Sequence, residues 1–372
     1  KEKISLSGHF DAGSIGELLE ADGALSFKFD ALSLYAFSPW IDYPLIIKDG
    51  TGSLSINVEL ENGKLKKGGS SFSVQNLNAN TINNDKQDLV FNDISGEFKY
   101  KLVNDDINII LDNLFLTTNS KLQFEDSAAS IKYNFETNQI NKATLVIDRF
   151  DLGSVKEISN QFLPEEHRAN VIINKLSAKG EIDNLKLKWD RTSDGEEPSL
   201  KLKAKFLEIE INEFESFPGL KNLTGEVNIE NEKGIIRSVS RDVKITKEDV
   251  FRAPLQLNQF SGSVNWDNQK YSFNDVTVKD DYMEAIFNGT VKYESLDNLY
   301  VDININSPTL NIPNFKVYYP KQIGEDGLGW LDTSLLEGTA ENTNIQMKGE
   351  VKDFPFIDEN NKPDLSKGYF RV

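Results

Sequence analysis

The segment Ser53–Leu60 reads Ser-Leu-Ser-Ile-Asn-Val-Glu-Leu, and its apolar residues fall at every second position. Successive side chains of a β-strand point to opposite faces of a sheet, so this pattern predicts a strand with one dry face and one wet face. The same alternation recurs at Glu97–Leu102, Leu200–Phe206 and Glu226–Ile229. We therefore predict β-strands along almost the whole chain.

Short polar segments separate these predicted strands. Asn62-Gly63, Asn104-Asp105, Asn231-Glu232 and Asp267-Asn268 each stand between two alternating stretches. Asn, Asp and Gly tolerate the left-handed backbone that a tight hairpin turn requires. The sequence therefore predicts a succession of antiparallel hairpins, and roughly thirty strands stacked about 4.8 Å apart would span on the order of 140 Å.

A weak repeat runs through the hairpins, in which a Ser or Thr and then a Gly precede an apolar strand. It is clearest at Gly96, Gly225 and Gly262, and looser copies place Gly8, Gly52 and Gly96 at intervals of 44 residues. A period of this size indicates an array of similar units that shield one another. A Gly at the same point of each unit predicts a β-bulge or a close backbone approach.

Helical patterns are few. Asp151–Phe162 and Gly327–Leu336 have apolar residues at helical spacing, and we expect short helices there, laid against a sheet. Residues 190–198 contain a polar run that predicts either a long loop or a boundary within the chain. So few helices leave most of the dry sheet face without a predicted cover.

Composition excludes several classes of function. The chain has 59 acidic and 41 basic residues, a formal charge of −18, and no Cys. An acidic chain repels nucleic acid at long range, so we expect no nucleic-acid partner. The two His residues, His9 and His167, are too few and too far apart for a triad or a metal site. We expect no metal, no cofactor and no catalytic residue.

Carboxylate pairs leave one enzymatic alternative open. Asp105-Asp106, Glu165-Glu166 and Asp280-Asp281 could supply the two carboxylates of a carbohydrate-active enzyme. They stand in polar runs, however, and we interpret them as solvated turns. The Asp358–Asn361 run resembles half of a calcium loop and lacks the rest, so it is also interpreted as a turn.

A long run of amphipathic hairpins has a dry face that something must cover. The strands could pack as a sandwich, close into a barrel, or curl into an open trough, and the shortage of helices favours the last two. We predict a mainly β fold: an elongated, curled antiparallel sheet of repeating hairpins that forms an open hydrophobic groove, with a few short helices.

The second half of the chain carries a recognisable order of motifs. Phe214–Leu220 is followed by Phe251-Arg252-Ala253-Pro254-Leu255, Phe260–Trp266, Trp330-Leu331-Asp332 and Met347–Phe356. This order resembles the YhdP family of AsmA-like envelope proteins of Gram-negative bacteria. The resemblance is most specific over residues 213–372 and is a matter of pattern before that.

The resemblance implies a location and an activity. Such proteins are much longer than this chain, are anchored in the inner membrane by an N-terminal helix, and project across the periplasm. They are implicated in phospholipid transport towards the outer membrane and in outer-membrane biogenesis, and they resemble bridge-like lipid transfer proteins. Residues 1–372 would then be a middle segment of one continuous β-groove. The anchor would lie outside it, and an outer-membrane or envelope protein is a possible partner.

The physical chemistry of lipids fits this role. Exposing an acyl chain to water costs about 0.8 kcal/mol per methylene, or on the order of 13 kcal/mol for a sixteen-carbon tail. A groove with a dry floor removes most of that cost without a catalytic group. The alternative is a structural or adhesive β-repeat protein whose own side chains fill the core. The predicted lipid-binding floor consists of alternating apolar residues: Leu54, Ile56, Val58, Leu200, Leu202, Val227, Ile229, Val264, Trp266, Val276, Val278, Val291 and Tyr293.

Overall fold

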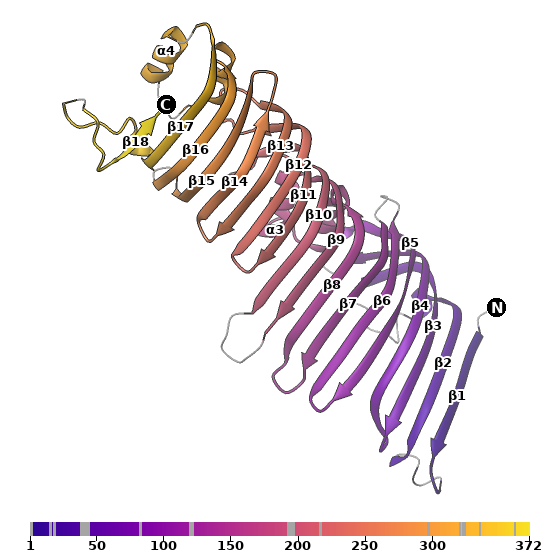
Figure 1. Ribbon diagram of the computed structural model, residues 1–372. Helices are drawn as coiled ribbons and strands as arrows, with labels where there is room; N and C mark the ends of the chain where they lie inside the picture. The colour runs from indigo at the N-terminus through magenta and orange to yellow at the C-terminus, as the bar shows by residue number, and fades with distance from the viewer. Residues whose placement is uncertain are drawn as a thin grey trace. The chain divides into compact units, whose positions relative to one another are not determined.

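A computed structural model describes residues 3–14, 17, 20–37, 45–81, 84–118, 123–191, 198–215, 218–295, 298–319, 321, 325–334, 336–360 and 362–372 (Figure 1). The chain divides into two compact units. Unit 1 consists of Lys1–Asn174 and Ile182–Leu202, and unit 2 of Lys175–Glu181 and Lys203–Val372. Each unit is described by itself.

Unit 1 is an antiparallel sheet in which each strand pairs with the next one along the chain. Strands β9 and β10, which follow in the same sheet, contribute residues to both units. The strands are β1 (Lys3–Asp11), β2 (Asp22–Ser33), β3 (Leu45–Glu61), β4 (Lys64–Thr81), β5 (Asn84–Val103), β6 (Asp106–Thr118), β7 (Gln123–Asn134), β8 (Gln139–Asp151), β9 (Lys179–Asp190) and β10 (Ser199–Ile211). The helices are α1 (Leu34–Phe37), α2 (Leu152–Phe162) and α3 (Arg168–Leu176).

Unit 2 repeats this plan, again with each strand antiparallel to the next. Its strands are β11 (Gly219–Glu230), β12 (Lys233–Thr246), β13 (Leu255–Asp267), β14 (Lys270–Lys279), β15 (Met283–Ser295), β16 (Asn298–Asn311), β17 (Thr339–Glu350) and β18 (Gly368–Arg371). The 3₁₀ helix η2 (Pro313–Tyr318) and helix α4 (Glu325–Ser334) lie between β16 and β17, and η4 (Val351–Asp353) follows β17.

The mainly β fold, the antiparallel hairpins and the few short helices are confirmed, in an open sheet rather than a curled one. The expected number of about thirty strands is wrong, because the described part of the chain has 18. The strands are longer than ordinary, with 17 residues in β3, 18 in β4 and 20 in β5. These three strands continue through register shifts in their pairing.

The predicted hairpin turns are in place. Asn62 and Gly63 join β3 to β4 with φ angles of 52° and 70°, the left-handed pair that a two-residue turn requires. Asn104, Asn231 and Asn268 also have positive φ in the turns that follow β5, β11 and β13. These turns fix the register of the strands on either side, and hence which residues share a face.

A line of β-bulges crosses the strands of each unit. In unit 1 the pairing shifts between Asp49 and Thr51, and Asn76 and Asn113 have positive φ. In unit 2 it shifts at Gly262, whose φ is 137°. The register also shifts beside Gly96, so Gly96 and Gly262 mark bulges, as the sequence predicts, whereas Gly8 pairs in regular register with Leu25. The bulges divide each strand into two parts with different surroundings.

On one side of the bulges the apolar face is packed. In unit 1 the packed cluster consists of Ile47, Leu77, Ala79, Leu89 and Phe91, and Leu34 of α1 packs against it. In unit 2 the packed cluster consists of Val243, Leu257, Val278, Met283, Ala285 and Leu310, with Phe315 and Tyr318 of η2 packed against it. We call these two regions the packed ends.

The helix predictions are also confirmed. Helix α2 begins at Leu152, after Asp151, whose side chain accepts a hydrogen bond from the Ser154 amide at 3.2 Å. Helix α4 covers Glu325–Ser334, close to the predicted range. Helix α3 was not predicted from the sequence. Within the described residues, no helix is long and apolar enough to span a membrane. Residues 192–197 of the predicted loop lie outside the described residues.

Candidate functional site

The apolar face of unit 1 continues beyond the packed end as rows of apolar side chains that run across the strands. One row passes through Val58 of β3 and contains small or apolar residues on eight consecutive strands: Gly8, Leu25, Val58, Gly68, Tyr100, Ile109, Ile131 and Ala143. The neighbouring row passes through Ile56 and contains Leu6, Phe27, Ile56, Ser70, Phe98, Leu111, Ala129 and Leu145. We call these the open rows of unit 1.

The open rows are not covered as the packed end is. Leu25, Val58 and Tyr100 are half-buried, whereas Ile109 and Ile131 are 36% and 39% exposed. The pKa of Tyr100 is raised because burial disfavours its charged form. An apolar surface of this extent, left partly open to water, marks an interaction site or a ligand-binding groove in a soluble protein.

Unit 2 has two corresponding rows. The first contains Val227, Ile236, Val264, Phe273, Gly289, Ile303, Met347 and Phe370. The second contains Ile229, Gly234, Trp266, Tyr271, Val291, Val301, Gly349 and Gly368. We call these the open rows of unit 2. Most of their side chains are half-buried, and Val301 is buried.

Most of the predicted floor residues lie on the apolar face of their own unit. Leu54, Ile56 and Val58 share one face of β3, and all three are half-buried. Val227, Ile229, Val264, Trp266 and Val291 lie in the open rows of unit 2. Tyr293 lies near the end of β15, opposite Leu299. Leu200 and Leu202 alternate with lysines on β10, and Leu200 is 39% exposed.

Two predicted floor residues have different surroundings from the others. Val276 and Val278 are only 6% and 8% exposed, and Val278 belongs to the packed end of unit 2. Both lie beyond the register shift that separates them from Phe273. Alternation in the sequence looks the same on either side of a bulge, so it could not separate these two from Val264.

Sequence reasoning missed several members of the open rows, including one in the alternating stretch Glu97–Leu102. Tyr100, Ile109, Ile131, Ile236 and Phe273 all face the same side as the predicted residues. The Asn-Gly and Asn-centred turns carried the missing signal, because a two-residue turn fixes which residues stand opposite each other. Counting outward from Asn62-Gly63 pairs Val58 of β3 with Gly68 of β4 across one bulge.

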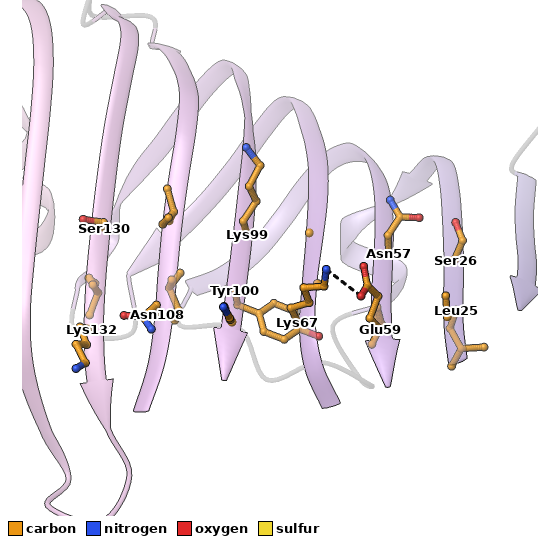
Figure 2. A pocket seen from close by; sticks show the side chains of 18 of the residues that line it. Leu25, Ser26, Asn57, Glu59, Lys67, Lys99, Tyr100, Asn108, Ser130 and Lys132 are labelled. Carbon is orange, nitrogen blue, oxygen red and sulfur yellow. Dashed lines mark ion pairs between the residues drawn. The ribbon is translucent and has the colours of Figure 1, made fainter. Parts of the chain in front are cut away.

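A hollow of about 1040 Å³ crosses β1–β8 of unit 1, and its lining includes Leu25, Val58 and Tyr100 of the first open row (Figure 2). One row of side chains beside it contains His9, Ala24, Glu59, Lys67, Lys101, Asn108, Lys132 and Lys142, and the other contains Ser7, Ser26, Asn57, Gly69, Lys99, Ile110 and Ser130. Gly68, Ile109 and Ile131 of the first open row also line the hollow, whereas Ile56 and Phe98 of the second open row do not. The hollow therefore includes the first open row of unit 1, with the two polar rows on either side of it.

The charges around this hollow largely neutralise one another. Lys132 lies 2.7 Å from Asp106, and hydrogen bonds from Lys132 and Asn134 lower the pKa of that carboxyl group. The other lysine pairs are Lys67 with Glu59 at 3.0 Å, Lys99 with Asp112 at 3.3 Å, and Lys142 with Asp190 at 3.3 Å. Paired lysines make a weak anion site, so the apolar lining of the hollow, and not its charged margin, belongs to the candidate site.

One of the carboxylates that could suggest chemistry has a structural role. Asp280, in the turn between β14 and β15, accepts hydrogen bonds from the Tyr282 and Met283 amides and from the Tyr318 hydroxyl. Both His9 and His167 are exposed. Among the residues that the structure describes, no group of three His, Asp or Glu side chains could hold a metal ion. The apolar rows remain the candidate site.

Comparison with known proteins points to a transport family. The family model described as YhdP protein matches residues 2–372. The chain is also similar to the intermembrane phospholipid transporter YhdP of Escherichia coli (strain K12), with 22% identity over 163 residues. That match covers 42% of this chain and 13% of the relative, so the chain spans a small part of the relative's length. No solved structure matches.

Proposed function

We propose that this chain, which belongs to the YhdP family, carries phospholipid between membranes by shielding acyl chains on its open rows. The proposal rests on one observation above all. The apolar face is buried at the packed ends, and it is left half-exposed along rows that cross eight strands in unit 1 and eight in unit 2. The similarity to a relative named as an intermembrane phospholipid transporter supports it.

The energetics suit a conduit. A sixteen-carbon tail in water costs on the order of 13 kcal/mol, and contact with a dry surface recovers much of that. The open rows offer Val, Leu, Ile and aromatic side chains on strand after strand, so a sliding chain leaves one contact as it makes the next. Near-uniform affinity along the rows keeps the lipid from being trapped, and the headgroup stays in water.

Family membership supports a wider setting, which is part of the same proposal. The chain would lie in the periplasm of a Gram-negative cell, as a segment of a longer protein held in the inner membrane by an anchor outside these residues. Envelope or outer-membrane proteins would receive the lipid at the far end. No reaction is required of the chain, because the work is the transfer of apolar surface between two dry environments.

Lipid content tests the proposal directly. We expect the purified chain to carry phospholipid, detected by native mass spectrometry and by extraction. Replacing Val227 and Val264 together by Asp places two charges in one open row, and we expect it to abolish the lipid content while cooperative unfolding persists.

The matched control puts the same charges on the same strands but on the other face. Asn228→Asp with Asn265→Asp alters β11 and β13 at the adjacent positions, which face away from the open rows. We expect this variant to keep its lipid. A chain that binds no phospholipid before any substitution would contradict the proposal and favour the structural β-repeat protein with a self-filled core.

A further inference from the structure

On the apolar face, aromatic rings lie over glycines of the neighbouring strand. Tyr100 stands opposite Gly68, and Trp266 stands opposite Gly234. A Cβ atom added to Gly68 would lie 2.6 Å from Cε1 of Tyr100, and one added to Gly234 would lie 2.6 Å from Cε2 of Trp266. Each ring therefore occupies the space that a side chain on the glycine would need.

The arrangement recurs on the same face. Phe72 of β4 lies over Gly96, with Cζ 3.0 Å from the position of a Cβ, and Phe10 lies over Gly23, with Cδ1 at 2.6 Å. Side chains of a strand normally stand away from the sheet. A ring that lies flat on the neighbouring glycine backbone projects less from the apolar face than a ring that stands away from the sheet.

Two of these pairs lie in the open rows. Tyr100 and Gly68 share their row with Val58, and Trp266 and Gly234 share theirs with Val291. Both rings are half-buried, so part of each is accessible from the face that the open rows form. They are therefore in a position to contact a ligand on that face.

We propose that Tyr100 over Gly68 and Trp266 over Gly234 are positioning pairs. Each glycine lets the ring lie flat on the sheet, so that an unbranched acyl chain can lie along the open row in contact with the ring. The inference rests on the proposed function, and it assigns a role to the two glycines. A larger residue there would force the ring to rise into the path of the lipid.

A purely structural role for these pairs has different consequences. Aromatic side chains can compensate for the weak strand propensity of a cross-strand glycine, which affects stability alone. If that were the whole role, lipid binding would follow stability in every variant. The positioning role predicts that binding and stability separate.

Gly68 and Gly69 give a matched pair of variants on one strand. Gly68→Val displaces the Tyr100 ring, whereas a Cβ on Gly69 would meet the Phe98 carbonyl at 3.5 Å and Lys99 Cγ at 3.6 Å, which are ordinary contacts on the polar face. With a phospholipid bearing a fluorescent acyl chain as the probe, we expect Gly68→Val to bind about tenfold more weakly, the effect of losing contact with about two methylene groups. Gly69→Val should bind like the unsubstituted protein.

A double variant tests whether lipid binding depends on the flatness of the open row or on the stability of the strand. Gly68→Val with Tyr100→Ala removes the displaced ring and refills its place, so we expect lipid binding to recover to within about threefold, or about 0.65 kcal/mol. Unfolding in urea is measured for every variant. Equal binding by Gly68→Val and Gly69→Val, or binding that follows the unfolding midpoints, would overturn the inference. An unsubstituted protein that binds no lipid would instead overturn the proposed function.

Trp266 reports on the second pair by its fluorescence. With Trp40, Trp189 and Trp330 replaced by Phe, we expect a phospholipid brominated on its acyl chain to quench the remaining indole. Gly234→Val should reduce that quenching by about half or more, as the ring loses its flat contact. Unchanged quenching in Gly234→Val would count against the inference, and no quenching in the single-Trp parent would show that Trp266 does not face the lipid.

Discussion

Val278 and Val264 lie on the same face of neighbouring strands of unit 2, but their surroundings differ. Val278 is 8% exposed and packs in a cluster with Leu257 and Met283, whereas Val264 is half-buried in an open row. The β-bulges lie between them, and Phe315 and Tyr318 of η2 pack against the cluster that contains Val278. The same residue type thus serves folding on one side of the bulges and remains available for a ligand on the other.

The largest expected effect comes from placing a charge on each side of the bulges. Val278→Asp buries a carboxylate with no partner, and we expect it to cost about 4 kcal/mol and to unfold much of unit 2. Val264→Asp should cost about 1 kcal/mol, because the half-exposed carboxylate stays hydrated. Urea unfolding of the two variants provides the comparison. Equal losses would mean that the open rows are ordinary core.

Removing apolar volume should give the next largest difference. Leu257→Ala leaves a cavity at a side chain that is 2% exposed, and we expect a loss of about 3 kcal/mol. Val227→Ala removes half-buried methyl groups from an open row, for an expected loss of about 1 kcal/mol. Thermal unfolding of lipid-free protein measures both. If Val227→Ala proved as damaging as Leu257→Ala, the open rows would have to be closely packed in solution.

The hydrogen bond from Tyr318 of η2 to Asp280 should make the unfolding free energy depend on pH. Burial and a hydrogen bond to Asp280 raise the pKa of Tyr318 above its ordinary value. The unfolded chain releases the Tyr318 proton near pH 10, whereas the folded chain retains it. The contribution of Tyr318 to the unfolding free energy is therefore complete below about pH 10 and is lost as the pH rises further.

Tyr318→Phe removes that contribution. We expect this variant to lose about 1 kcal/mol at neutral pH, from the missing hydrogen bond, and to show a shallower decline of stability above about pH 10. Urea midpoints measured between pH 7 and pH 11 test both expectations. A decline as steep as that of the unsubstituted protein would show that Tyr318 does not cause the loss of stability at high pH.

The smallest effect is expected at the polar face. Lys348 and Asp302 form a cross-strand pair at 2.8 Å, with 44% and 46% of their side chains exposed. Exposed pairs contribute about 0–1 kcal/mol, so Lys348→Met should change the unfolding free energy by less than about 1 kcal/mol and leave lipid binding unchanged. A marked loss of lipid from this variant would show that the polar face takes part in transport.

Much of the fold could be predicted because strand alternation and turn residues are local signals. Ser53–Leu60 and Asn62-Gly63 suffice to predict a hairpin, and Asp151 marks the start of α2. Helix α3 was missed because Val171, Ile172 and Ile173 favour strands by their β-branched side chains, and tertiary packing overrides that preference.

The candidate site could be predicted only in part. Val58, Val227 and Trp266 were identified because they stand in regular alternation. Whether an apolar residue is packed or open depends on bulges and on what covers the face, and both arise from contacts between distant residues. Val278 and Val264 look alike in sequence for that reason. The ring-over-glycine pairs, such as Tyr100 with Gly68, needed the register of two strands.

Cross-linking from adjacent positions of β3 tests the central claim most directly. Val58 lies in an open row and Asn57 on the polar face, so a photoreactive amino acid at each position samples opposite sides of one strand. In protein that carries phospholipid, we expect a lipid adduct from position 58 and none from position 57. Equal adducts from both positions, or none from position 58, would contradict the account.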